Sequence, residues 1–165
     1  MHRVVIETHD GPFTAWFTDT GLAELDFPVR PRHATPDETE VLHPQLSNWI
    51  RLTREALAAV LAGETPVALP PFDLSPGTEF QQKIWRALLT IPVGQTMTYG
   101  EISASIGTPR AVRAAGGACG ANPIPVLIPC HRVVAAHGQL GGFSGGLHWK
   151  RKLLQREGVL PKELI

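Results

Sequence analysis

The chain has 165 residues, of which 43% are hydrophobic, and its 15 Lys and Arg balance its 15 Asp and Glu. This length fits one domain or two small ones, and the hydrophobic content is enough for a folded core. The absence of any stretch of about 18 apolar residues excludes a membrane-spanning helix. The N-terminus has no long apolar run and soon turns acidic, so it is not a signal peptide. We therefore expect a cytoplasmic protein that keeps its thiols reduced, although Cys119 and Cys130 could in principle form one disulfide.

The zero net charge conceals two halves of opposite sign. Residues 1–75 contain five basic and eleven acidic residues, a net charge of −6, whereas residues 76–165 contain ten basic and four acidic residues, a net charge of +6. This asymmetry indicates that only the second half meets a polyanion. The alternative is ordinary variation of surface charge.

Three short runs at the start of the chain are typical of β-strands. Residues 3–8 are apolar and β-branched, while residues 13–18 and 21–27 alternate between apolar and polar side chains. Turn-forming residues separate the runs at 10–12 and 19–21. The pattern predicts an antiparallel meander.

A helix is predicted after this meander. Residues 28–36 contain three prolines and are expected to form a loop, and from 38 to 61 the apolar positions follow helical spacing, with Gly63 as the stop. Four prolines in residues 66–77 indicate a linker, with a possible short strand at 72–74.

We therefore predict an N-terminal α/β domain of residues 1–75 and a C-terminal domain of residues 76–165. The second domain opens with Thr78, a plausible N-cap because Gln81 follows three positions later. The expected buried face of this helix consists of Phe80, Ile84, Trp85, Leu88 and Leu89.

The next pattern is helix, glycine turn, helix. Thr98 is expected to cap a helix over 99–106, and Gly107 and Thr108 form a turn. Pro109 is expected at the first position of a second helix, over 110–118. This layout is typical of a helix-turn-helix DNA reader, but such pairs also occur as plain packing.

The most informative stretch places Cys130 beside His131 in the apolar run from Ile128 to Val134. Apolar runs rarely carry two reactive side chains unless a site uses them. His131 can accept or relay the thiol proton, and Glu157 can orient the histidine. The alternative is a buried structural cysteine.

The motif Pro129-Cys130-His131-Arg132-Val133, with Asn122-Pro123 upstream and the glycine-rich loop 138–146 downstream, resembles the O6-alkylguanine-DNA alkyltransferases over residues 78–158. The resemblance implies an α/β fold, with a sheet-plus-helix N-terminal domain and a mainly helical C-terminal domain that carries the helix-turn-helix. It implies irreversible transfer of an alkyl group from O6 of a flipped guanine to Cys130. The implied partner is alkylated double-stranded DNA. The protein would act as a monomer, would need no cofactor and would not bind a membrane.

The resemblance also implies the role of each site residue. The catalytic residues would be Cys130, His131, Glu157 and Asn122, with a bound water between thiol and imidazole and Asn122 as a hinge. The residues that contact substrate or DNA would be Tyr99, Arg110, Ala111, Arg113, Gly116, Phe143 and Ser144. From the residues alone, Asn122-Pro123 could be a simple turn, Tyr99 could pack on the core, and Arg113 could be a solvated surface residue.

The chain departs from the family pattern at Phe143, where the family usually has a tyrosine whose hydroxyl lies near the guanine O6. Some family members hold zinc in the N-terminal domain, but residues 1–75 contain no cysteine, and no metal-ligand spacing occurs elsewhere. The glycine loop does not fit a dinucleotide fingerprint. The basic cluster Lys150-Arg151-Lys152, with Arg156, could face phosphates or form a solvated helix end.

Three rival functions are less consistent with the sequence. A non-catalytic lesion binder would lack the active cysteine that Cys130 supplies. A cysteine hydrolase usually has its base distant in sequence, whereas His131 is adjacent, and it would turn over repeatedly. A helix-turn-helix transcription factor would be expected to carry an additional DNA-binding or effector module.

Overall fold

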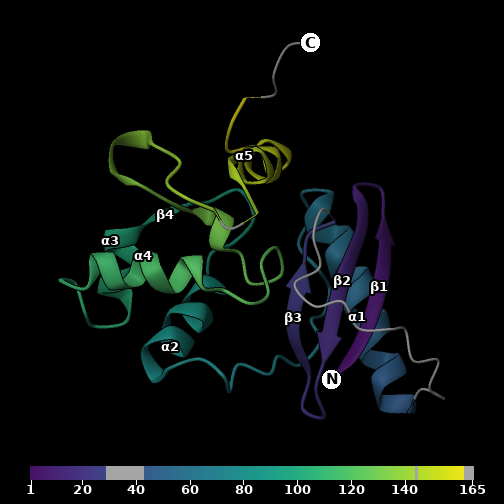
Figure 1. Ribbon diagram of the computed structural model, residues 1–165. Helices are drawn as coiled ribbons and strands as arrows, with labels where there is room; N and C mark the ends of the chain where they lie inside the picture. The colour runs from purple at the N-terminus through teal and green to yellow at the C-terminus, as the bar shows by residue number, and fades with distance from the viewer. Residues whose placement is uncertain (29–42, 144, 162–165) are drawn as a thin grey trace.

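The computed structural model describes residues 1–28, 43–143 and 145–161. Three strands, β1 (His2–Thr8), β2 (Gly11–Phe17) and β3 (Leu22–Asp26), form one sheet, with α1 (Pro44–Leu61) on the same side of the molecule (Figure 1). The other side holds α2 (Glu79–Leu88), α3 (Tyr99–Ser105), α4 (Val112–Gly120) and the two-residue strands β4 (Met97–Thr98) and β5 (Val133–Val134). The last helix is α5 (Leu147–Arg156).

The predicted meander is confirmed, and the fold is α/β. β2 pairs antiparallel with both neighbours, and its register places Ile6 opposite Phe13. Both side chains are fully buried, as alternation on a half-buried sheet requires.

Helix α1 begins later than the spacing predicts. The predicted start at residue 38 and residues 38–42 lie outside the described residues, but His43 is the N-cap and has extended backbone. Pro44 occupies the first helical position, where its missing N–H costs nothing. In a helix that began at residue 38, Pro44 would lie in the interior, where its ring clashes with the preceding turn and one hydrogen bond is lost, so the helix starts at Pro44.

The chain between the two sides of the molecule runs along the sheet edge. The strand expected at 72–74 is a single bridge between Phe72 and Leu22. The capping box of Thr78 and Gln81 at the start of α2 is confirmed. Leu89, however, is not buried: it lies at the C-cap and is 36% exposed, because the helix ends one residue before it.

Helices α3 and α4 pack against each other as the predicted helix-turn-helix. The capping box of Thr98 and Glu101 is confirmed. The expectation that Pro109 opens the second helix is wrong, because Pro109 and Arg110 form a turn, the N-cap is Ala111, and α4 runs from Val112 to Gly120. The amide of Ala111 donates to the carbonyl of Thr108 at 2.9 Å, which closes that turn before the helix starts.

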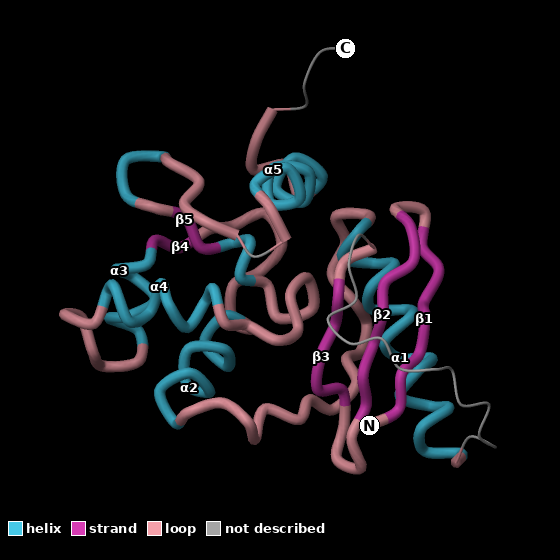
Figure 2. Tube along the Cα trace, in the orientation of Figure 1, coloured by secondary structure: helices cyan, strands magenta, loops and turns pink. Residues whose placement is uncertain are grey.

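A single apolar core runs through both sides of the molecule. It includes Phe17 and Leu25 of the sheet, Leu57 of α1, Ile84 of α2 and Leu153 of α5. Strands β4 and β5 pair in parallel and join the start of α3 to the segment after Cys130 (Figure 2). This short pairing brings the two motifs singled out in the sequence together.

Candidate active site

Cys130 lies in a tight turn rather than in a strand. Pro129 precedes a short 3-10 helix, Cys130–Arg132, and the amide of Cys130 donates to the carbonyl of Ile128 at 2.8 Å. The chain becomes extended only at Val133, where β5 pairs with β4. The turn thus places the thiol next to the first residues of α3.

The apolar segment 124–128 is a compact turn held by Asn122. The Asn122 side chain accepts from the amide of Ile124 at 3.0 Å and donates to the carbonyl of Ile128 at 2.8 Å. Within it Val126 has φ of 75°, a conformation that strains a β-branched residue. A buried asparagine that satisfies two main-chain groups fixes this turn, and with it the approach of the chain to Cys130.

His131 is held by a buried carboxylate. Its Nε2 lies 2.9 Å from Oε1 of Glu157, and both side chains are fully buried. Arg132 also binds Glu157, with Nε 2.8 Å from Oε1, and donates from Nη1 to the carbonyl of Ile91 at 2.7 Å. Burial opposes the charge of Glu157, but the hydrogen bonds from His131 and Arg132 outweigh it and hold the pKa of Glu157 below its usual value.

The resting charge states of the thiol and imidazole follow from burial. Burial raises the pKa of Cys130 to about 11, although the Asn122 amide and the Lys150 ammonium oppose it. Burial also lowers the pKa of His131 below 6.5, against the effect of Glu157. At neutral pH the thiol is therefore protonated and the imidazole is neutral. Nδ1 of His131 is buried and has no hydrogen-bond partner in the part of the chain that the structure describes, so this nitrogen can accept a proton.

Cys130 opens into a cavity of about 380 Å³. The residues that line it come from α3, α4, the turn at Cys130 and the glycine-rich loop: Tyr99, Gly116, Cys119, Gly120, Cys130, Gly142 and Phe143. Four predicted site residues, Tyr99, Gly116, Cys130 and Phe143, therefore meet around one cavity. The predicted Ser144 lies outside the described residues.

The glycine-rich loop approaches the cavity closely. Gly141 has φ of +74°, and a Cβ there would lie 2.8 Å from the hydroxyl oxygen of Tyr99. Glycine is therefore needed both for the backbone conformation and for the space. The loop forms a wall against Tyr99.

Cys119, which the sequence indicated only as a possible disulfide partner of Cys130, lines the same cavity as Cys130. Both cysteines are free. Burial raises the pKa of Cys119 to about 12, and the neighbouring Cys130 adds to the rise. No histidine adjoins Cys119 in the sequence, so it has no equivalent of the base beside Cys130.

Lys150 faces neither phosphates nor solvent. It is fully buried, and its Nζ donates to the carbonyls of Val133 at 2.7 Å and Gly142 at 3.1 Å. The Nζ lies 5.9 Å from the centre of the Tyr99 ring, and its charge lowers the pKa of Cys130. Among the described residues, no carboxylate lies within ion-pair distance of it. Lys150 is thus a buried cation beside the thiol, and only the apolar residues three and four positions away on its helix face, Leu147, Leu153 and Leu154, could have signalled this in the sequence.

The other basic side chains of α5 that the sequence grouped with Lys150 have partners within the protein. The Lys152 ammonium lies 4.6 Å from the centre of the Trp149 ring and 3.9 Å from Asp10. Arg156 forms an ion pair with the same Asp10. For Arg156, neither a phosphate contact nor a solvated helix end describes the structure.

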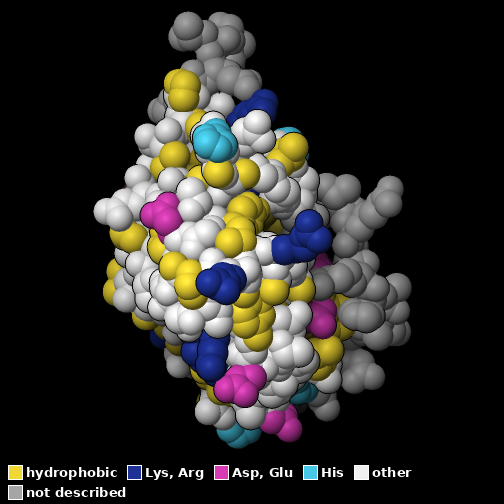
Figure 3. All heavy atoms as spheres, turned by 90° about the vertical axis from the view of Figure 1, so that its left-hand side faces the viewer, with side chains coloured by type: hydrophobic (Ala, Val, Ile, Leu, Met, Phe, Trp, Pro, Cys, Tyr) yellow, Lys and Arg dark blue, Asp and Glu magenta, His cyan; other side chains and the backbone are white. Residues whose placement is uncertain are grey.

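Helix α4 presents a face of small residues around one long cation. Val112, Arg113, Ala114, Gly117 and Gly120 are exposed, and a Cβ added at Gly117 or Gly120 would meet nothing within 4 Å. Arg110 is exposed in the preceding turn, and Ala111 is partly buried at the N-cap. Figure 3 shows the side of the molecule that carries these helices, where Lys and Arg side chains lie around a hydrophobic strip.

The described residues show neither a metal cluster nor a membrane helix. Within them, no three His, Cys, Asp or Glu side chains gather as they would around a metal ion. None of the described helices is both long and apolar enough to cross a bilayer.

A thiol with its own buried histidine–glutamate pair, reached through a cavity behind the second helix of a helix-turn-helix, is the arrangement of a protein that uses cysteine as a nucleophile. Sequence comparison then gives the family. The 6-O-methylguanine DNA methyltransferase DNA binding domain matches residues 79–159. The chain is 52% identical to a methylated-DNA–protein-cysteine methyltransferase of Mycobacterium bovis, over 95% of this chain and 92% of that protein.

Two further relatives agree with this match. A methylated-DNA–protein-cysteine methyltransferase of Methanosarcina acetivorans is 39% identical, over 96% of this chain and 99% of that protein. The crystal structure of Mycobacterium tuberculosis OGT in complex with DNA superposes with a TM-score of 0.75 at 39% identity, over 96% of this chain and 93% of that one. This chain belongs to the methylated-DNA–protein-cysteine methyltransferase family.

Proposed function

We propose that the protein repairs DNA by moving an alkyl group from O6 of guanine onto Sγ of Cys130. The observation that carries this assignment is the buried His131, adjacent to Cys130 in the sequence, which turns Nε2 to Glu157 and whose Nδ1 has no hydrogen-bond partner among the described residues. The family to which the chain belongs is named for transfer to a protein cysteine.

The reaction follows from these charge states. The thiol proton passes to Nδ1 of His131, directly or through a water, and Glu157 stabilises the imidazolium that forms. Sγ attacks the alkyl carbon, a carbon–sulfur bond forms, and the carbon–oxygen bond to guanine breaks. The electron pair goes to guanine, which takes up the proton from His131. The thioether on Cys130 is stable, so each molecule reacts once.

The cavity residues would bind the flipped guanine. A guanine leaving group carries negative charge, which hydrogen-bond donors and cations stabilise. Among the described residues, the Tyr99 hydroxyl and the amides near Cys130 are the candidate donors, and the buried ammonium of Lys150 contributes its positive charge from behind the cavity wall. Phe143 provides a ring wall without a hydroxyl.

Helix α4 would present the base to this cavity. A base must leave the duplex before a buried thiol can reach it. The small exposed side chains of α4 allow its backbone to enter a groove, and Arg113 is long enough to fill the space of the extruded nucleotide. Arg110 and Ala111, at the start of α4, would contact the phosphate backbone of the DNA. We further propose that the protein works as a cytoplasmic monomer on alkylated duplex DNA, with a domain boundary near residue 75.

The test is a single-turnover reaction with a duplex that contains one O6-methylguanine. We expect the intact mass to rise by one methylene per protein molecule, and peptide mapping to place it on Cys130. Cys130→Ala should abolish the transfer and Cys119→Ala should retain it. A label on Cys119, or repeated turnover by one molecule, would refute the proposal.

A further inference from the structure

Two consecutive residues at the end of α5 reach into opposite sides of the molecule. Glu157, the C-cap, binds His131 and Arg132 in the active site. Arg156, the last helical residue, turns to the sheet and α1. Successive side chains on a helix diverge by about 100°, so neighbours can serve different surfaces from one rigid backbone segment.

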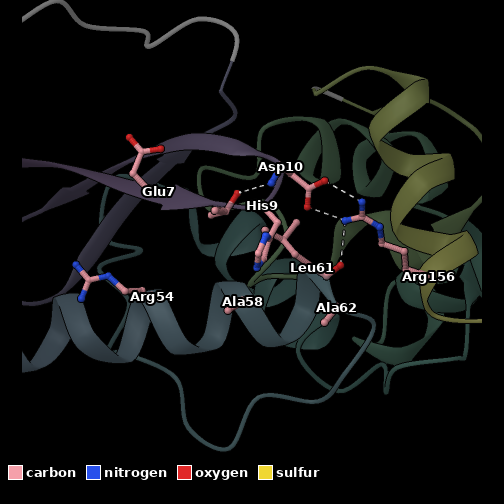
Figure 4. A pocket seen from close by; sticks show the side chains of 9 residues that line it. Glu7, His9, Asp10, Arg54, Ala58, Leu61, Ala62 and Arg156 are labelled. Carbon is pink, nitrogen blue, oxygen red and sulfur yellow. Dashed lines mark hydrogen bonds and ion pairs between the residues drawn. The ribbon is translucent and has the colours of Figure 1, made fainter.

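Arg156 is anchored through its whole guanidinium group. Nη1 lies 2.7 Å from Oδ2 of Asp10 and Nη2 lies 2.8 Å from Oδ1, a bidentate pair, and Nη1 also donates to the carbonyl of Leu61 at 3.0 Å. Figure 4 shows the side chain of Arg156 reaching from α5 across to Asp10 and to the end of α1. This geometry combines charge with direction and is among the stronger polar contacts in proteins.

The main chain at Arg156 is also fixed. Gly63, just beyond α1, has φ of +77°, and a Cβ there would lie 2.2 Å from the carbonyl oxygen of Arg156. The glycine therefore lets the end of α1 contact the peptide group that joins Arg156 to Glu157. A shift of Arg156 must move that peptide group and hence Glu157.

We propose that Asp10 is a positioning residue for alkyl transfer: by holding Arg156, the hairpin between β1 and β2 fixes Glu157 and thereby the orientation of His131. The inference rests on the proposed function, because it assigns His131 the role of base. It gives the N-terminal sheet a part in the reaction without any contact with substrate.

The ion pair lies beside a cavity of about 550 Å³, and the Arg156 side chain is 34% exposed. Hydrogen bonds from Arg156 lower the pKa of Asp10 most, the charges of Arg156, Lys152 and His9 add smaller contributions, and burial opposes them.

Three charged groups and burial set the protonation of His131. Glu157 favours the charged imidazole, whereas Arg132, Lys150 and burial oppose it, and the neighbouring Cys130 thiol is neutral. A loosened Glu157 stabilises the imidazolium less. Removal of the Asp10 carboxylate should therefore lower the pKa of His131 further.

The experiment compares Asp10→Asn with the wild type by single-turnover reaction with free O6-benzylguanine, which needs no DNA binding. We expect Asp10→Asn to be slower by about two-fold to thirty-fold, the range of coupling through a packed network. The acid limb of its pH–rate profile should move to lower pH. Arg156→Gln removes the same ion pair from α5 and should move the limb in the same direction.

Glu55→Gln is the matched control, because it removes an exposed ion pair with Arg51 on α1 that touches neither α5 nor the active site. Its profile should coincide with that of the wild type. A limb that stays in place in Asp10→Asn, or that moves equally in Glu55→Gln, would overturn the inference and leave Asp10 a purely structural role.

A second readout separates this inference from the proposed function. Titration of the ¹⁵N-labelled His131 ring by NMR measures its pKa whether or not alkyl transfer occurs. A lowered pKa in Asp10→Asn supports the positioning role, and an unchanged pKa contradicts it. Wild-type protein that fails to alkylate Cys130 would instead refute the proposed function.

Discussion

The amide of Leu25 donates a 2.9 Å hydrogen bond to the carbonyl of Pro123. Leu25 belongs to β3, one of the two edge strands of the N-terminal sheet, and Pro123 opens the turn that leads to Cys130. On its outer side, β3 thus pairs a main-chain amide with the active-site turn instead of with another strand. Phe27 extends this contact, since its ring lies 5.8 Å from Phe143 and 4.9 Å from Trp149.

The pH dependence of alkyl transfer should report a base with a low pKa. Burial lowers the pKa of His131 from its usual 6.5, so the imidazole is mainly neutral near pH 7 and becomes protonated as the pH falls through the lowered value. We expect the rate with free O6-benzylguanine to be flat near neutrality and to fall as the pH drops through this lowered pKa. His131→Ala should remove the limb and slow the reaction by about 10²- to 10⁴-fold at neutral pH. A limb above pH 7 would mean that the imidazole is charged at rest.

Lys150→Met should impair the reaction more than the fold. The change leaves the carbonyls of Val133 and Gly142 without this donor, at about 1–3 kcal/mol each, but it relieves the cost of burying a charge. We expect a melting temperature close to that of the wild type and alkyl transfer slower by about ten- to hundredfold. The acid limb should move to higher pH, because Lys150 lowers the pKa of His131. Retention of the wild-type rate would make Lys150 a purely structural residue.

Arg113→Ala should slow repair of duplex DNA more than reaction with free O6-benzylguanine. The exposed arginine on α4 is proposed to fill the space of an extruded nucleotide, and the free base needs no extrusion. Arg86→Ala, which removes an exposed cation from α2, serves as the control and should affect both substrates little. Equal losses on both substrates in Arg113→Ala would indicate a folding role.

Gly117 allows DNA binding to be separated from stability. Nothing lies within 4 Å of a Cβ placed there, so Gly117→Ala should stabilise α4 by about 0.5–1 kcal/mol and raise the melting temperature by about 1–4 °C. Gly117→Gln should fold as well but bind duplex DNA more weakly, because the longer side chain holds α4 away from the groove. Unchanged duplex affinity in Gly117→Gln would place the DNA on another face.

Phe143→Tyr restores the residue usual in the family. Its new hydroxyl should donate to the developing guanine anion, and one such bond contributes about 1.5–3 kcal/mol, an upper bound of about ten- to hundredfold in rate. Because the ring also packs edge-on against Phe27, the hydroxyl must be accommodated without losing that contact. Single-turnover kinetics on methylated duplex would measure the gain. A slower variant with intact folding would show that the loop does not place residue 143 against O6.

Local sequence signals predicted the elements well wherever a local interaction determines them. The capping boxes at Thr78 and Thr98 were readable because each is complete within four residues. The adjacent Cys130 and His131 also indicated the position of the active site. By contrast, the apolar run 124–128 had the composition of a strand, and only the side chain of Asn122 makes it a turn.

Partnerships across the chain could not be predicted in this way. Lys150 and Arg156 have the same charge and lie on one helix, yet one is buried among carbonyls and the other pairs with Asp10, 146 positions away. Pro109 fits the preference of proline for the first position of a helix. The hydrogen bond from Ala111 to Thr108 instead closes a turn there, and α4 starts only at Val112. These outcomes depend on tertiary packing, which outweighs local propensity.

The uninterrupted core gives the sheet a further influence on repair. Because apolar side chains from Ile6 to Leu153 form one cluster, the two sides of the molecule should unfold in a single cooperative transition. Because each molecule reacts once, the number of lesions that can be repaired equals the number of folded molecules. The extent of repair therefore depends on the amount of folded protein as well as on the rate constant. A destabilising substitution in β1 or β2 would lower the number of folded molecules even where the rate constant at Cys130 is unchanged.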